Sequence, residues 1–235
     1  MTNNSEGSEK LESLDIYNPI LPHQSTVYFT VLSIIQAIAF GFLLLKSTSL
    51  TEEFNWTVLL RAILVSVVIV IVWHRYATES QFLWPLTWMD TLIPFFIGAI
   101  SFFCVFSVDL KVSLSFFLIC IVAIELAAIG AYHNAWKQRK RKKIQRIYLL
   151  AFQEKPEVGK RLISVLTSFD CQNILWFAFL LLPSIVLLIL FLFYYQRWYE
   201  IVFPIVLLVF LFVGETRIRI YKTLAEDPAL KPYFD

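Results

Sequence analysis

The chain has 235 residues, of which 58% are hydrophobic and 16% are charged, and its formal net charge is +2. Soluble domains are about half apolar and about a quarter charged, so this composition excludes an ordinary soluble globular domain and indicates a membrane protein. The three cysteines show neither CxxC spacing nor an even-numbered framework. They are predicted to be free thiols, which excludes a small disulfide-stabilised secreted module.

In chain order, residues 1–26 are polar and acidic and lack the basic start and cleavage site of a signal peptide, which predicts a flexible N-terminal tail. Six apolar runs follow, and each approaches the roughly 20 residues that a helix needs to cross the hydrocarbon core. They lie at about 27–45, 56–74, 86–107, 112–133, 173–195 and 200–216. The sequence therefore predicts an all-α integral membrane protein, a bundle of about six transmembrane helices.

Four of these helices fall within residues 27–135 and two within residues 173–216. Between them, the basic segment 136–172 is expected to form one or two short helices, broken near Pro156 and Gly159, and residues 217–235 form a C-terminal tail. Lys and Arg in short loops mark the cytoplasmic side, and the basic segment holds ten of the twenty. Both termini and this segment are therefore predicted to be cytoplasmic, at a plasma membrane or bacterial inner membrane.

The basic run after the fourth predicted helix is expected to contact anionic lipid headgroups, because polybasic segments beside a membrane are attracted to them. A cytosolic protein is a second partner that this run suits. Nucleic acid is not expected, since no recognition motif accompanies the charge. The residues expected to make the contact are Lys137, Arg139, Lys140, Arg141, Lys142, Lys143 and Arg146.

Small residues recur at four-residue spacing on two of the predicted helices. Such stripes let helices approach closely in lipid, where packing rather than hydrophobicity drives association. The contact is predicted to lie either within one subunit or between identical subunits, and the sequence leaves both alternatives open. The residues are Ser33, Ala37 and Gly41 on the first helix and Ala123, Ala127 and Ala131 on the fourth.

Ionisable residues inside predicted spans are costly and usually functional. Glu125 lies near the middle of the fourth helix, and Arg61 lies about six residues from the outer edge, where its long side chain can snorkel or serve a pathway. The topology brings His74, Asp90 and His133 to the same leaflet as Glu125. These residues are predicted to form one polar cluster that handles ions or protons, with Asp90 and Glu125 as its carboxylate pair. No metal-ligand spacing or cofactor motif is present, so no metal or cofactor is expected.

Three functions follow from these features, and none is enzymatic, because the sequence lacks GxSxG, HExxH, Walker A and GxGxxG motifs. The first is a homo-oligomeric channel or pore-like protein that conducts ions or protons and responds to a cytosolic signal through its basic segment. The second is a non-conducting adaptor that docks a cytosolic protein, an outline shared with small effector subunits of bacterial defence systems by analogy of architecture alone. The third is a proton-coupled transporter, although no inverted repeat is visible.

Overall fold

The computed structural model describes residues 26–49, 55–79, 82, 88–109, 111–194 and 198–233, and within these ranges the chain is helical and contains no strand. Residues 1–25 of the predicted N-terminal tail lie outside them. The all-α prediction is confirmed for this part of the chain. The elements are α2 (Thr26–Ser49), α3 (Trp56–Glu79), α4 (Trp88–Phe106), α5 (Leu114–Arg139), α6 (Lys142–Ala151), α7 (Pro156–Phe193), α8 (Tyr199–Arg217), α9 (Ile220–Ala225) and a 3-10 turn, η3 (Lys231–Tyr233).

Among the residues that the structure describes, four helical segments are long and apolar enough to cross a membrane: α3, α5, α7 and the stretch Tyr199–Ala225. The described apolar stretches of α2 and α4, Thr30–Lys46 and Leu92–Phe106, are shorter, so the arrangement with six spans stays a prediction. Large apolar side chains such as Leu182, Phe193 and Phe212 are exposed along the helices. Apolar exposure on this scale indicates a lipid-facing surface.

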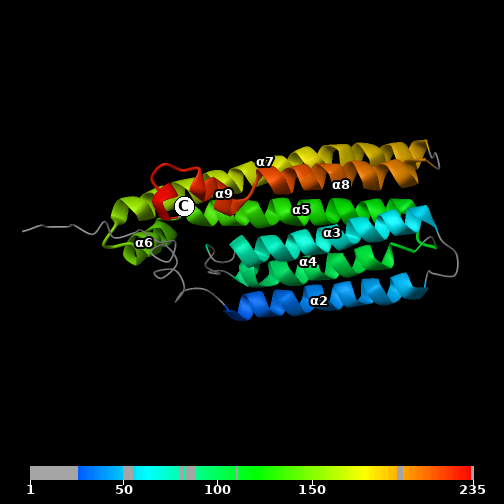
Figure 1. Ribbon diagram of the computed structural model, residues 1–235, viewed down its shortest axis with the longest axis horizontal. Coiled ribbons are helices and arrows are strands. Elements are labelled where there is room, and N and C mark those ends of the chain that lie inside the picture. Colours follow the sequence, from blue (N-terminus) through cyan, green and yellow to red (C-terminus); the bar gives the residue numbers. More distant parts are fainter. Residues whose placement is uncertain are drawn as a thin grey trace, which may run out of the picture.

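Figure 1 shows the long helices side by side, with α2 at one edge of the bundle and α7 and α8 at the other. The last turns of α4 and α7 and the first turns of α5 and α8 lie at one end of the molecule. The opposite end carries α6, α9 and the C terminus and is called the α6 end below. The most extensive pairing joins α5 to α7, while α8 also packs on α3, and α2 packs on α4 and α3.

The helix α7 is one continuous element of 38 residues, about 57 Å long, and it crosses the predicted boundary between the basic segment and the fifth span. Pro156 occupies its first turn, where a missing N–H costs no hydrogen bond. The predicted break at Gly159 does not occur. A Cβ at Gly159 would lie 3.1 Å from Cβ of Phe152, so this glycine permits close packing instead of ending a helix.

The residues after α8 were predicted to be a tail, and the structure folds them back onto α7. Leu224 of α9 and Leu230 are fully buried. Asp227 accepts a hydrogen bond from Arg161 Nε of α7 at 2.8 Å, and Arg161 holds the pKa of this carboxyl below its usual range. The C-terminal segment is therefore part of the α6 end.

Two glycines outside the predicted small-residue stripes bring helices into close contact. A Cβ at Gly98 of α4 would lie 2.2 Å from Cγ2 of Ile35 on α2. At Gly214 of α8, a Cβ would lie 2.3 Å from Nε1 of Trp176 on α7. A Cβ at Gly41, in the predicted stripe, would meet nothing within 4 Å. The close approaches thus fall where a large side chain of one helix faces a glycine of its neighbour.

The predicted stripe on α2 does not form a tight contact within the subunit, because a different face of that helix points inward. The buried residues of this face are Leu32, Gln36, Ala39 and Leu43, whereas Ala37 is exposed and Ser33 half-buried. On α5 the stripe residues Ala123, Ala127 and Ala131 are half-buried. An interface between identical subunits stays a prediction.

We expect Gly214→Ala to lower the free energy of unfolding by about 1–3 kcal/mol, because the added methyl group overpacks the contact with Trp176. Gly41→Ala is the matched control: both changes improve helix propensity, by about 1 kcal/mol, but Gly41 has open space. SDS titration in mixed micelles measures the free energy of unfolding of both variants. Equal stability of the two variants would show that the α7 and α8 contact does not depend on a glycine.

Candidate functional site

A narrow cavity of about 130 Å³ runs inside the bundle, between α3, α5, α7 and α8. Along α5 its lining extends from Ile121 to Arg139, about 27 Å by helical rise, and along α3 from Val68 to Glu79. Most of this length is apolar. Charged groups line the part nearest the α6 end, so the cavity joins an apolar interior to a polar layer at that end.

Glu125 lies in the apolar part of the cavity lining, near the middle of α5. Its side chain is buried, with the residue only 4% exposed. One carboxylate oxygen accepts a hydrogen bond from Ser184 Oγ of α7 at 2.8 Å. The other oxygen has no hydrogen-bond partner among the residues that the structure describes. A buried polar atom left unpaired is costly, so this carboxylate is not explained by packing alone.

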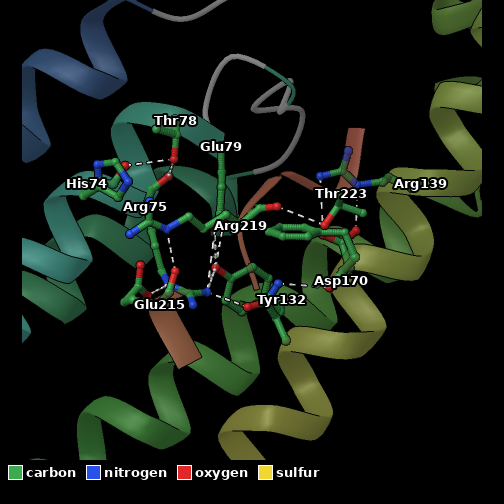
Figure 2. A network of polar contacts seen from close by, with 12 residues as sticks. His74, Arg75, Thr78, Glu79, Tyr132, Arg139, Asp170, Glu215, Arg219 and Thr223 are labelled. Atoms are coloured by element: carbon green, nitrogen blue, oxygen red, sulfur yellow. Dashed lines mark hydrogen bonds and ion pairs between the residues drawn. The ribbon is translucent and has the colours of Figure 1, made fainter. Parts of the chain in front are cut away.

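Arg75 of α3 is the centre of a network that ties together four helices at the α6 end, as Figure 2 shows. Its Nη1 donates hydrogen bonds to Tyr132 Oη of α5 at 2.9 Å and to Asn173 Oδ1 of α7 at 2.5 Å, while its Nε pairs with the carboxylate of Glu215 on α8. Tyr132 in turn donates to Glu79 of α3 at 2.7 Å. Arg75, Glu79 and Tyr132 of this network line the cavity, and the charged groups of the network are all partnered.

Arg139 and Asp170 form a second buried group beside the first (Figure 2). Arg139 Nε lies 2.7 Å from Asp170 Oδ2, and Nη2 lies 3.4 Å from Oδ1, which is a two-pronged contact. Arg139 Nη1 also donates to the carbonyl oxygen of Phe82 at 3.3 Å and to Tyr148 Oη of α6 at 3.2 Å. Arg139 was predicted to contact lipid, and this prediction is wrong: the residue is 4% exposed, because its face of α5 points at α7.

Tyr148 connects this buried pair to α6. Its hydroxyl donates to the carbonyl oxygen of Phe82 at 2.5 Å while it accepts from Arg139. Burial raises the pKa of Tyr148 to about 12, so the phenol keeps its proton, and its role as donor, across the physiological range. The neighbouring guanidinium of Arg139 opposes this rise only in part.

The structure does not assemble the predicted cluster of histidines and carboxylates. His74 and His133 lie on exposed faces, and neither lines the cavity. Figure 2 shows His74 to one side of the Arg75 network. Asp90 belongs to the first turn of α4, and its side chain lies outside the part of the chain whose side chains are described. The pairing of Asp90 with Glu125 therefore stays a prediction, and Glu125 is the predicted pathway residue that the structure locates in the cavity.

Arg61 neither snorkels nor lines the cavity. It is 1% exposed and lies near the end of the bundle opposite to the α6 end. Its Nη1 donates to the carbonyl oxygens of Ser107 at 3.3 Å and Val112 at 3.4 Å, and Nη2 lies 4.0 Å from Glu200 Oε2. The guanidinium therefore fastens the connection between α4 and α5 to α3 and α8.

No family model matches the chain, and neither does any curated protein or solved structure. Among the residues with described placement, no three or more His, Cys, Asp or Glu side chains gather as metal ligands would. The charged groups that line the cavity are the Glu125 carboxylate in its apolar part and the ion-paired residues at the α6 end.

Four charged residues of these two groups were not predicted as site residues: Arg75, Glu79, Asp170 and Glu215. Arg75 and Glu79 carry a signal, since opposite charges at i and i+4 at the end of an apolar run indicate a paired helix terminus. Asp170 and Glu215 carry no comparable pattern. Their roles depend on which helix faces pack together.

Proposed function

We propose that the protein is a channel-like membrane protein that conducts protons through the cavity between α3, α5, α7 and α8. The observation that carries this proposal is Glu125, a buried carboxylate with one oxygen that has no partner among the described residues, in an otherwise apolar stretch of that cavity. An ionisable residue at membrane depth that faces an internal space is characteristic of a proton or ion path.

The surroundings of Glu125 favour protons over metal cations. A bare cation such as Ca²⁺ takes about six to eight oxygen ligands, and Mg²⁺ needs about six in strict geometry. Glu125 and Ser184 are the polar side chains in contact there, and the adjacent lining consists of residues such as Ile121, Ile124 and Ala128. One carboxylate and one hydroxyl cannot replace a hydration shell, whereas a carboxylate can accept and release a proton.

The proposed path continues from Glu125 to the α6 end through Tyr132 and Glu79, which share a hydrogen bond. Glu125 and Tyr132 are two helical turns apart on α5, about 10 Å, which exceeds the length of a hydrogen bond. Water molecules are needed to bridge that gap. A cavity needs about 10–15 Å³ of water-accessible volume to hold one water molecule. A cavity of about 130 Å³ therefore has room for several water molecules.

We propose further that the α6 end faces the cytoplasm. It carries the basic segment, Arg217, Arg219 and Lys222, whereas Lys46 and Lys111 both contact Asp109, which follows α4 at the opposite end. The excess of Lys and Arg in short loops on one side sets orientation in membranes. Self-association and a cytosolic protein partner, both expected from the sequence, stay predictions, as does the absence of an enzymatic activity.

Glu125→Gln is expected to reduce proton flux about 100-fold or more, because glutamine keeps an acceptor for Ser184 but cannot transfer a proton. Flux is measured in proteoliposomes containing a pH-sensitive dye, with uptake driven by a potassium gradient and valinomycin. Glu157→Gln, at an exposed carboxylate of α7, should conduct like the parent. If Glu125→Gln conducts like the parent, Glu125 is structural. If the parent carries no flux, the proposal fails and the adaptor hypothesis gains.

A further inference from the structure

The helix α6 is amphipathic and packs on α7 and α5 at the α6 end. Ile144 and Tyr148 are its buried residues, and Phe152 continues this face just after the helix ends, all three packed in the core that α7 also forms. On its exposed face, Lys142, Lys143 and Arg146 are accessible. This helix is therefore held by one apolar face while its opposite face is strongly basic.

The charges around α6 are unfavourable without an anionic partner. The N-cap residue Arg141 makes no side-chain cap hydrogen bond, and Lys142 and Lys143 occupy the first turn, where the helix dipole repels cations. Within the described ranges, none of the exposed cations of this region forms an ion pair; Lys140 instead lies over the ring of Trp136. These exposed cations are Lys137, Lys140, Arg141, Lys142, Lys143 and Arg146.

Two side chains of α6 reach the residue that lines the α6 end of the cavity. Tyr148 Oη accepts from Arg139 Nη1 at 3.2 Å, and Gln145 Nε2 donates to the carbonyl oxygen of Arg139 at 3.3 Å. Arg139 and its partner Asp170 both line the cavity. A displacement of α6 breaks both contacts and removes one hydrogen-bond partner of the guanidinium that lines this end of the cavity.

We propose that anionic lipid headgroups bind the basic face of α6 and hold this helix docked, which tightens the Arg139 and Asp170 pair at the end of the cavity. Headgroups neutralise the mutual repulsion of the exposed cations and so favour the docked helix. The exposed Leu150, on the last turn, adds an apolar contact, and a helix with a basic face and apolar side chains suits the membrane interface. The lipid contact and its effect on Arg139 are proposed independently of proton conduction. Only the interpretation of the cavity as a proton path rests on the proposed function.

The test measures the accessibility of the cavity instead of flux, so that it succeeds or fails independently of proton conduction. Ala135→Cys places a thiol in the lining one turn before Arg139, and Cys171→Ser removes the exposed native thiol, since Cys104 and Cys120 are buried. The full-length protein is placed in nanodiscs of phosphatidylcholine, alone or mixed equally with phosphatidylglycerol. A water-soluble maleimide should label the introduced thiol about fivefold or more slowly in the mixture.

A triple variant of α6, Lys142→Gln with Lys143→Gln and Arg146→Gln, should lose this dependence on lipid. The matched control removes three exposed positive charges that lie at the same end of the bundle but on other helices: Lys160→Gln, Arg217→Gln and Lys222→Gln. In that control variant, the rate of thiol labelling should still depend on the lipid composition. Equal labelling of the parent in both lipids, or the same loss in the control, overturns α6 as the lipid site.

Tyr148→Phe separates binding from coupling, because it keeps the ring in the core and removes the hydroxyl contacts to Arg139 and Phe82. In this variant, phosphatidylglycerol should still protect the amides of α6 from hydrogen exchange, while labelling of the introduced thiol becomes independent of lipid. If labelling still follows the lipid, the hydroxyl does not transmit the effect and the coupling is overturned. If α6 gains no protection in either protein, the lipid contact itself is overturned.

Discussion

Arg75→Met is expected to lower the free energy of unfolding by about 3–5 kcal/mol, because it removes the shared partner of two buried carboxylates. Arg75 pairs with Glu215 and lies 3.8 Å from Glu79, and it also donates to Tyr132 and Asn173. Methionine fills a similar volume without supplying any donor. The network joins α3, α5, α7 and α8, so the loss should be global and should appear as lower resistance to SDS titration and heating.

Arg217→Met is the matched control, since Arg217 ends α8 and is exposed, and its loss should change stability by no more than about 0.5 kcal/mol. The loss of stability in Arg75→Lys should lie between the losses in Arg217→Met and Arg75→Met. Lysine retains the charge but presents a point donor, which cannot serve carboxylate, phenol and amide in the fixed directions of a guanidinium. Equal stability of Arg75→Met and Arg217→Met would mean that the carboxylates protonate or hydrate without cost.

The helices and the buried carboxylate were predictable because each depends on local sequence. The second predicted span starts at residue 56, and α3 begins at Trp56, since the length of an apolar run determines where a spanning helix fits. Glu125 was predicted because one carboxylate in an apolar run has few alternatives to facing an internal space. The structure places it in the cavity lining with Ser184 as its partner.

The remaining features depend on which helix faces meet, and no local pattern encodes that. Arg139 was grouped with exposed lysines because it belongs to the same basic run, yet its position on α5 turns it toward Asp170. Asp170 itself was placed in the basic segment 136–172, outside the predicted spans, because the apolar run of the fifth span begins after it, while α7 starts at Pro156 and continues through it. Likewise, Gly214 gains its role from Trp176, 38 residues earlier in the chain.

Asp170→Leu is expected to cost about 3–5 kcal/mol, because it leaves the buried charge of Arg139 without its carboxylate. The double variant Arg139→Met with Asp170→Leu removes both charges, and it should recover most of that loss. An apolar pair of similar volume is often as stable as a buried ion pair. In the double variant the carbonyl oxygen of Phe82 keeps its hydrogen bond from Tyr148, while the Tyr148 hydroxyl loses Arg139 as a donor but still donates to Phe82.

Unfolding by SDS titration of the parent, Asp170→Leu, Arg139→Met and the double variant completes a double-mutant cycle for the pair. Strong coupling, with the double variant near the parent, assigns the cost of each single change to an uncompensated charge. If the double variant is as unstable as the sum of the singles, the two side chains act through packing. In the first case the pair adds little to net stability, and what distinguishes it is its position between α6 and the end of the cavity that contains Glu125.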